Sequence, residues 1–543
     1  NTTASSNTAV GHNSLTSTTG GGNNTAVGNF AAGSNTTGNT NTAIGGDVLA
    51  SQTTGSQNTA VGYKAMYAHT TGVQCVGIGV SALQANTTTS ELTAVGAHSL
   101  QANTTGTQNV ACGAWSLRFN TTGDKNTAAG YQALAQNSTA DENTAFGYNA
   151  AQANTTGNNN TAIGSQALDA NTTGIKNTAV GSGSLGANTT ASNNTGVGFQ
   201  ALLSNTDGYR NTAVGMLAMQ LNTSGFDNTA LGEQALAVNT TGDENTAVGR
   251  NALYANTTAN NNTAVGSDAL YANTTGANNT AVGFQALDAQ TTAWSNTAIG
   301  AYALTANTTG ANNNAMGVSA LAANTTGGSN VAIGDEALDA NTTGSSNTAV
   351  GKASLSSNTT AGNNTAVGFR ALDANTTGTE NTAVGKDALG ANNGDYNVAV
   401  GNDALLANTT ADKGTAVGYK ALVATTTGAS NTAVGYKALQ ANTTGNTNIA
   451  IGYEALFTNT EGDRSTAIGF QALYTSNPSG NADMYNVGVG YHALYATTTG
   501  LRNTAIGSLC LDANTDADYN TGVGYGALGA NTTGDTNTAV GYI

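Results

Sequence analysis

A single phrase of seventeen residues recurs along the whole chain, and this repetition constrains the fold more than any other feature of the sequence. The glycine that ends NTAVG marks the phrase: it stands at Gly11, returns every seventeen residues as far as Gly385, and has occurred 32 times by Gly541. The spacing changes twice, by one residue lost near 390–400 and by four residues gained near 475–486. Repetition at this period predicts a solenoid in which each phrase forms one coil.

The NTAVG part of the phrase has the pattern of a β-strand. The residue before the marker glycine is always apolar, the Thr two positions earlier exchanges with Val or Ile, and only Ala or Gly stands between them. Alternation with a period of two is typical of a strand. We therefore expect the Thr and Val side chains to point into the core, and the Ala/Gly stripe to form a flat outer face.

The second half of the phrase contains a leucine four residues after the marker, then Ala and Asn-Thr-Thr-Gly. We expect LxANTT to form a second short strand with its Leu inward, and NTTG to turn the chain back. The predicted fold class is all-β: a parallel β-solenoid (β-roll) of about 32 seventeen-residue coils, with two short strands per coil. It is expected to run as a single continuous array over residues 1–543.

The small size of each coil predicts association with other coils and other chains. One coil contributes about one Val and one Leu, which is too little apolar surface to offset the entropy of ordering seventeen residues. Stability must therefore come from stacking. A stripe of Ala and Gly also lets another chain approach closely, so we expect the chain to associate with itself through this stripe and through the open ends of the solenoid.

The composition argues against several kinds of partner. The net charge is −16, and only 14 Lys and Arg are spread over the chain, which does not suit a nucleic-acid partner. No apolar run approaches the ~20 residues that cross a bilayer, so this segment is not expected to insert into a membrane. The chain opens inside a phrase at Asn1 and shows no signal peptide, as expected of a segment of a longer protein.

Residues that could catalyse a reaction or bind a metal are few. The four histidines occupy unrelated positions of the phrase, and we expect them on the surface. Acidic pairs such as Asp141-Glu142 lack the aspartate spacing of calcium-binding β-rolls, so solvated turns are expected there. We therefore predict no enzyme activity, no cofactor and no metal site.

Two sets of residues are candidate interaction sites. The position after the marker varies over most of the chain but is aromatic on five successive repeats, which predicts an exposed ladder for contact with glycans, a receptor or another chain. The ladder comprises Tyr419, Tyr436, Tyr453, Phe470 and Tyr491. The NTT phrase is also a glycosylation sequon, and a source that modifies it would carry sugars at positions such as Asn103, Asn273 and Asn442.

The phrase NTAVG, and most closely NVAIG at 330–334 and NVAVG at 397–401, resembles the SVAIG-type repeat in the head domains of trimeric autotransporter adhesins. The whole phrase NTAxGYxALxxNTTG is similar to the tail-fibre-like repeats of bacteria and bacteriophages. The resemblance implies a homotrimer and a structural extracellular fibre, the rigid shaft or head of a surface adhesin or filament.

Two alternative functions stay open. A bacteriophage tail fibre for receptor binding would share the architecture and would place the chain on a virion appendage instead of a cell surface. An ice-binding solenoid is the third hypothesis, because Thr-rich solenoids can bind ice through flat Thr-x-Thr arrays. The Thr-x-Thr pattern itself is absent from the phrase.

Overall fold

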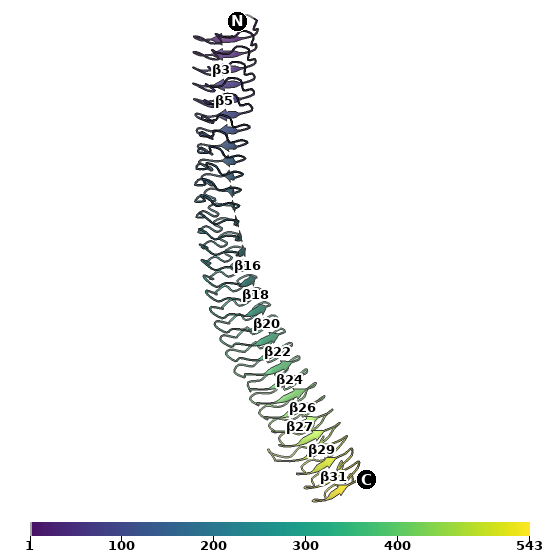
Figure 1. Ribbon diagram of the computed structural model, residues 1–543. Helices are drawn as coiled ribbons and strands as arrows, with labels where there is room; N and C mark the ends of the chain where they lie inside the picture. The colour runs from purple at the N-terminus through teal and green to yellow at the C-terminus, as the bar shows by residue number, and fades with distance from the viewer. Residues whose placement is uncertain (1–2) are drawn as a thin grey trace. The chain divides into compact units, whose positions relative to one another are not determined.

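The computed structural model describes residues 3–543, and within that range it is an all-β parallel solenoid with 32 three-residue strands and no helix. Accordingly, none of these residues belongs to a helix long and apolar enough to cross a membrane. The described chain divides into two compact units, the first ending at Thr275 and the second beginning at Gly276. Within each unit, successive coils stack in the order of the sequence (Figure 1).

From β1 to β16, successive strands of the first unit pair in parallel and in register, so that equivalent positions of the phrase lie side by side, as Thr beside Thr in β1 and β2. They are β1 (Thr8–Val10), β2 (Thr25–Val27), β3 (Thr42–Ile44), β4 (Thr59–Val61), β5 (Val76–Ile78), β6 (Thr93–Val95), β7 (Val110–Cys112), β8 (Thr127–Ala129), β9 (Thr144–Phe146), β10 (Thr161–Ile163), β11 (Thr178–Val180), β12 (Thr195–Val197), β13 (Thr212–Val214), β14 (Thr229–Leu231), β15 (Thr246–Val248) and β16 (Thr263–Val265).

The second unit repeats this arrangement. Its strands are β17 (Thr280–Val282), β18 (Thr297–Ile299), β19 (Asn314–Met316), β20 (Val331–Ile333), β21 (Thr348–Val350), β22 (Thr365–Val367), β23 (Thr382–Val384), β24 (Val398–Val400), β25 (Thr415–Val417), β26 (Thr432–Val434), β27 (Ile449–Ile451), β28 (Thr466–Ile468), β29 (Val487–Val489), β30 (Thr504–Ile506), β31 (Thr521–Val523) and β32 (Thr538–Val540).

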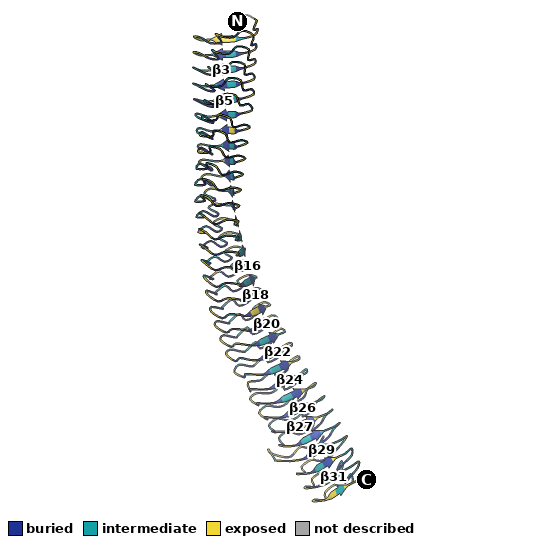
Figure 2. Ribbon diagram, viewed as in Figure 1, coloured by how far each residue is buried: buried dark blue, intermediate teal, exposed yellow. Residues whose placement is uncertain are grey.

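The orientation predicted for the strands is wrong. The middle Ala of the strand is the buried residue, as at Ala213, whereas Val214 beyond it is 37% exposed. Figure 2 shows a dark blue, buried segment within the labelled strand arrows. The reason is lack of room, because the interior opposite the strand is already filled from the turns. At Gly77 even the single Cβ of an alanine would lie 2.8 Å from Cγ of Met66, and at Gly196 it would lie 2.6 Å from Oγ of Ser184, so the interior has no room for a side chain larger than Ala. The Ala/Gly stripe is therefore part of the core and is not a surface through which another chain could bind.

The second strand predicted for each coil is also absent from residues 3–543, where each coil carries one strand. Turns replace it: in the coil of β14, Ala235 N donates to Gly232 O, and both Gln234 (φ 56°) and Leu236 (φ 54°) are left-handed. A left-handed residue at the third position is typical of type II turns and cannot continue a strand. The inward position of the leucine is confirmed, since Leu236 is fully buried.

The marker glycine is required where the strand ends and the chain passes closest to the next coil. At Gly215 the backbone has φ 141°, and an added Cβ would lie 2.2 Å from the carbonyl oxygen of Gly232 in the next coil. A side chain at this position would therefore strain the backbone and also push neighbouring coils apart. This double constraint accounts for glycine in every repeat.

Both changes of spacing fall at the same corner of the coil, after the Asn of the NTT position. At the shortened coil, Asn392 Nδ2 donates to Gly394 O at 2.8 Å and closes the turn with one residue fewer. At the lengthened coil, Met484 is buried and a bridge joins Asp463 to Asp483, while β28 and β29 stay paired in register. This corner therefore accepts a change of length without disturbing the strands.

Candidate interaction surfaces

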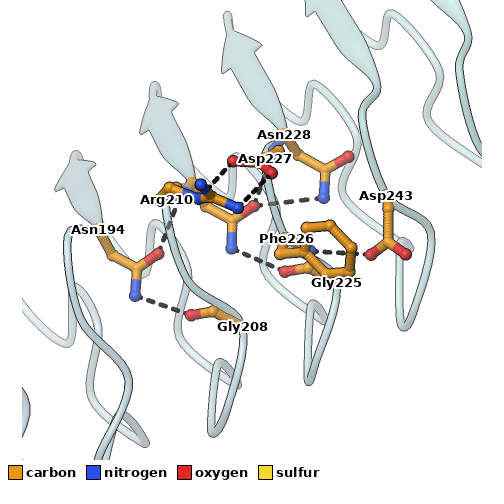
Figure 3. A network of polar contacts seen from close by, with 9 residues as sticks. Asn194, Gly208, Arg210, Gly225, Phe226, Asp227, Asn228 and Asp243 are labelled. Carbon is orange, nitrogen blue, oxygen red and sulfur yellow. Dashed lines mark hydrogen bonds and ion pairs between the residues drawn. The ribbon is translucent and has the colours of Figure 1, made fainter.

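Two columns of buried asparagines join the coils from inside. The first Asn of NTAVG is one column: Asn211 N donates to Asn194 Oδ1 at 2.9 Å, and its own Nδ2 donates to Gly225 O at 2.7 Å. Figure 3 shows the same bond from Asn194 to Gly208. The Asn of NTT forms the second column, in which Nδ2 donates to the side chain one coil earlier, as from Asn222 to Asn205 Oδ1 at 2.8 Å. Most of these amides are buried and hydrogen-bonded, as buried polar groups require, whereas Nδ2 of Asn143 and of Asn520 is buried without a partner.

Acidic residues in the turn before NTAVG support the backbone of the preceding coil. Asp243 Oδ1 accepts from Phe226 N at 3.0 Å (Figure 3), and Asp141 Oδ1 accepts from Asp124 N at 2.7 Å. The following residue points outward, where Glu142 pairs with Lys125 at 3.5 Å. No group of three or more His, Cys, Asp or Glu within residues 3–543 could hold a metal ion. The acidic pairs therefore have a structural role that spacing alone did not reveal.

The outer face of the strands has the same chemistry from coil to coil in each unit. It consists of two columns, one of Thr and one of apolar side chains, and none of the 32 strands places a charged residue in either column. Leu231 is 38% exposed, Phe146 43% and Met316 48%. On β18–β20 a shallow pocket of about 300 Å³ lies on this face and is lined by Met316, Val331 and Ile333 among others. Exposed apolar surface that continues from coil to coil is typical of an interaction site.

The five aromatic residues predicted as a ladder do lie together. Consecutive ring centroids are 5.0–5.4 Å apart, and the Tyr453 and Phe470 rings are inclined by only 6°. Each ring is 40–49% exposed, but its faces lie against its neighbours in the stack. Sugar rings bind to the faces of aromatic rings, so this ladder offers a glycan mainly edges and hydroxyl groups. Its stacking suits a role in holding coils together.

A second aromatic column runs beside the ladder and comprises Phe457, Tyr474 and Tyr495, with centroids 5.1 and 5.3 Å apart. A polar row links the two columns, in which Gln471 donates to Glu454 at 2.8 Å and contacts His492 at 3.0 Å. Partial burial, and then the charge of Glu454, raises the pKa of Tyr453. Sequence reasoning missed this second column, although its residues stand at one position of three successive repeats.

The glycosylation hypothesis does not fit the folded coil. Asn103, Asn273 and Asn442 belong to the second asparagine column and are fully buried. Nδ2 of Asn103 donates to Gly106 O at 2.9 Å, that of Asn442 to Gly445 O at 3.0 Å, and that of Asn273 to Asn256 Oδ1 at 3.1 Å. A sugar would have to be attached to a nitrogen that is enclosed and already bonded.

One histidine also departs from expectation. His69 is fully buried at a position where other coils have Asn, and its ring contacts Gly72 O at 2.9 Å and Asn86 Nδ2 at 3.0 Å. Burial lowers the pKa of His69, and the hydrogen bond to the Gly72 carbonyl only partly opposes this. The prediction of a surface residue is wrong here because the imidazole replaces an amide of the asparagine column.

The asparagine columns, the outer strand face and the aromatic ladders are the features that recur from coil to coil in the described residues. Comparison with known proteins adds no further identification: no protein-family model, no curated protein and no solved structure matches this chain.

Proposed function

We propose that the chain is a structural extracellular fibre segment that assembles with copies of itself through the outer strand face. The observation that supports this is the uncharged, partly apolar face formed by the Thr and Val columns on every coil. The chain carries a net charge of −16, so two copies repel each other unless they meet where charge is absent. A second copy also repeats with the same spacing, so each coil can meet an equivalent coil.

The shaft or head of a surface adhesin and the shaft of a bacteriophage tail fibre both use such a segment, and the resemblance of the repeats favours these two settings. A homotrimer is the assembly that this resemblance favours. We assign the proposed interface to the outer strand face and not to the Ala/Gly stripe, because the stripe is buried.

The proposal is tested by sedimentation velocity and native mass spectrometry of the chain and of the double variant Val214→Lys, Leu231→Lys. We expect the unchanged assembly to contain two or three copies and the variant to dissociate into single chains that keep the circular dichroism of folded coils, since both residues are exposed at the surface of β13 and β14. The matched control is Met216→Lys, Gln234→Lys, which adds the same charge on the adjoining turns. A monomeric unchanged chain, or equal dissociation of both variants, would contradict the proposal.

Ice binding is a second candidate because the same face carries Thr and Val in two regular columns. Against it, the apolar column contains Phe146, Leu231 and Met316, whose different lengths interrupt a flat surface. Thermal hysteresis of the purified chain measures this directly. Ordinary freezing at the equilibrium melting point would remove the candidate.

A further inference from the structure

A cleft of about 520 Å³ lies on the turns that follow β4, β5, β6 and β7, on a part of the coil that the proposed fibre does not use. Its floor consists of Ala68, Ala85 and Ala102, one from each of three successive coils. In the fourth coil the same position is Phe119, and Tyr67 lines the cleft in the first coil. The rings of Tyr67 and Phe119 are 40% and 41% exposed. The cleft is therefore a trough between two accessible aromatic rings.

The backbone of the floor is already satisfied, so side chains must recognise any ligand. The N–H groups of Ala68, Ala85 and Ala102 donate to the carbonyl groups of the next coil at 3.0 Å each. The side chains of the wall form a row in which Gln101 donates to Gln84 Oε1 at 3.0 Å and Arg118 Nε donates to Gln101 Oε1 at 3.2 Å.

The acceptor oxygens of Gln84 and Gln101 are both used within this row, whereas several donor groups remain available to a ligand. Within residues 3–543, Nε2 of Gln84 and the terminal amino groups of Arg118 form no hydrogen bond or ion pair. The Arg118 guanidinium is held 5.0 Å from the Trp115 ring and 4.8 Å from the Phe119 ring, and no Asp or Glu lines the cleft. At the other end, Lys64 Nζ lies 5.8 Å from the Tyr67 ring. The cleft is thus rich in donors and positive charge, on a chain that is otherwise acidic.

We propose that this cleft binds an acidic oligosaccharide. Aromatic rings with planar amide and guanidinium donors are the groups that suit sugar rings, and an unpaired guanidinium suits a carboxylate. Coils are spaced by ~4.8 Å, which is close to the length that one pyranose unit occupies in an extended chain. The trough therefore accommodates a short run of uronate units, with Arg118 on a carboxylate and with Tyr67 and Phe119 in contact with sugar rings at its two ends.

This site differs from the aromatic ladder at Tyr419–Tyr491 in one decisive respect. There each ring lies 5.0–5.4 Å from the next, so ring faces cover one another. Here Tyr67 and Phe119 are separated by three coil steps and by an alanine floor, so a ligand can lie between them.

The test is calorimetric titration of the full chain with trigalacturonate, with neutral cellotriose as the matched probe. We expect trigalacturonate to bind, with an affinity that falls as salt is raised, and cellotriose to bind at least about tenfold more weakly. Arg118→Gln should weaken trigalacturonate binding by at least about tenfold. Ala85→Leu should abolish it by filling the floor without removing a polar group.

The control variant is Arg250→Gln, which removes the same charge at a remote coil and should bind trigalacturonate as the unchanged chain does. Circular dichroism of each variant establishes that the coils are intact. Absence of binding, equal binding of cellotriose, or binding that survives Ala85→Leu would overturn the proposal. None of these outcomes depends on the number of copies in the assembly, so the result is independent of the proposed fibre.

Discussion

Two leucines of one coil lie in opposite environments, and the contrast explains how the coil is built. Leu231 ends strand β14 and is 38% exposed, whereas Leu236, five residues later on the turn side, is fully buried. On the strand side the inward residue is Ala230, and on the turn side it is the leucine. The coil therefore places its large side chains inward from the turns and outward from the strand.

The contrast teaches that available space, and not hydrophobicity alone, decides which face of a short strand is inside. The interior is narrow, and leucines from the turns fill it, so the strand that faces them can contribute only a methyl group. The β-branched residues of the strand still benefit from their position, since Val and Thr favour a pleated backbone. They also give the coil an outer surface with which to meet a partner.

The marker glycine is the tightest point of the strand side, and its replacement should have the largest effect. We expect Gly232→Ala to lower the free energy of unfolding by more than about 4 kcal/mol, since φ is 141° and the new Cβ would lie 2.5 Å from Gly249 O. Urea denaturation measures this. Gly46→Ala, one residue past a marker, is the control, because its Cβ would meet only Tyr63 at 3.5 Å. Similar losses in the free energy of unfolding of both variants would contradict a specific requirement for glycine at the marker position.

The two leucines provide the most direct test of the comparison. Leu236→Ala should cost about 3 kcal/mol through lost burial and the cavity left behind. Leu231→Ala should cost about 1 kcal/mol, because its side chain is already partly in water. Thermal and urea unfolding of the two variants give the ratio. Equal losses in the free energy of unfolding would show that Leu236 is no more enclosed than Leu231.

Enlarging a residue should have opposite consequences on the two faces of strand β14. We expect Ala230→Leu to destabilise the first unit by about 2 kcal/mol, since Ala230 is fully buried and the interior is filled. Leu231→Phe should change stability by less than about 0.5 kcal/mol, because Phe146 already occupies the same position of another coil. Differential scanning calorimetry compares them. If Ala230→Leu is tolerated as well as Leu231→Phe, the Ala stripe is not enclosed.

The smallest expected effect is a dependence of stability on pH from His69 on the turn side. Burial lowers the pKa of His69 in the folded chain below 6.5, its ordinary value, so the unfolded chain takes up the proton first as pH falls. The free energy of unfolding that neutral His69 contributes should be fully present above about pH 6.5. It should fall below that pH, by at most about 1.4 kcal/mol per pH unit. Unfolding curves of the unchanged chain and of His69→Asn between pH 8 and pH 5 measure the difference. A slope that is identical in both would contradict the assignment.

The sequence located the strand of NTAVG and the leucine side of the core, but it also predicted a second strand that is a turn, and it could not orient the first. Alternation in Thr-Ala-Val is symmetric, so it separates two faces without saying which is inside. Restriction to Ala or Gly at 32 aligned positions was itself the available signal, because an exposed position would also accept polar residues. The left-handed leucines carried no such signal: residues such as Leu236 and Leu253 adopt φ near 53° although leucine does not favour it.

Candidate sites were predictable to the extent that they depend on stacking. Equal spacing brings Tyr419 beside Tyr436, as the repeat predicts. Burial of Asn103 and His69 depends on the asparagine column, whose members are replaced only by other polar residues such as Gln52, Gln290 and Thr425. The cleft at Tyr67 was not predictable, since it arises from the coincidence of three alanines with a glutamine row on neighbouring coils.

The corner that contains Pro478 has a practical consequence. Four additional residues enter the chain there, Asn481 reaches back to accept from Thr444 Oγ1 at 3.0 Å, and β28 and β29 remain in register. A peptide grafted at the same corner of any coil should therefore be displayed without rebuilding the scaffold. Grafts on consecutive coils would stand ~5 Å apart in a row. The choice of coils would therefore set the distance between the binding loops that the chain displays.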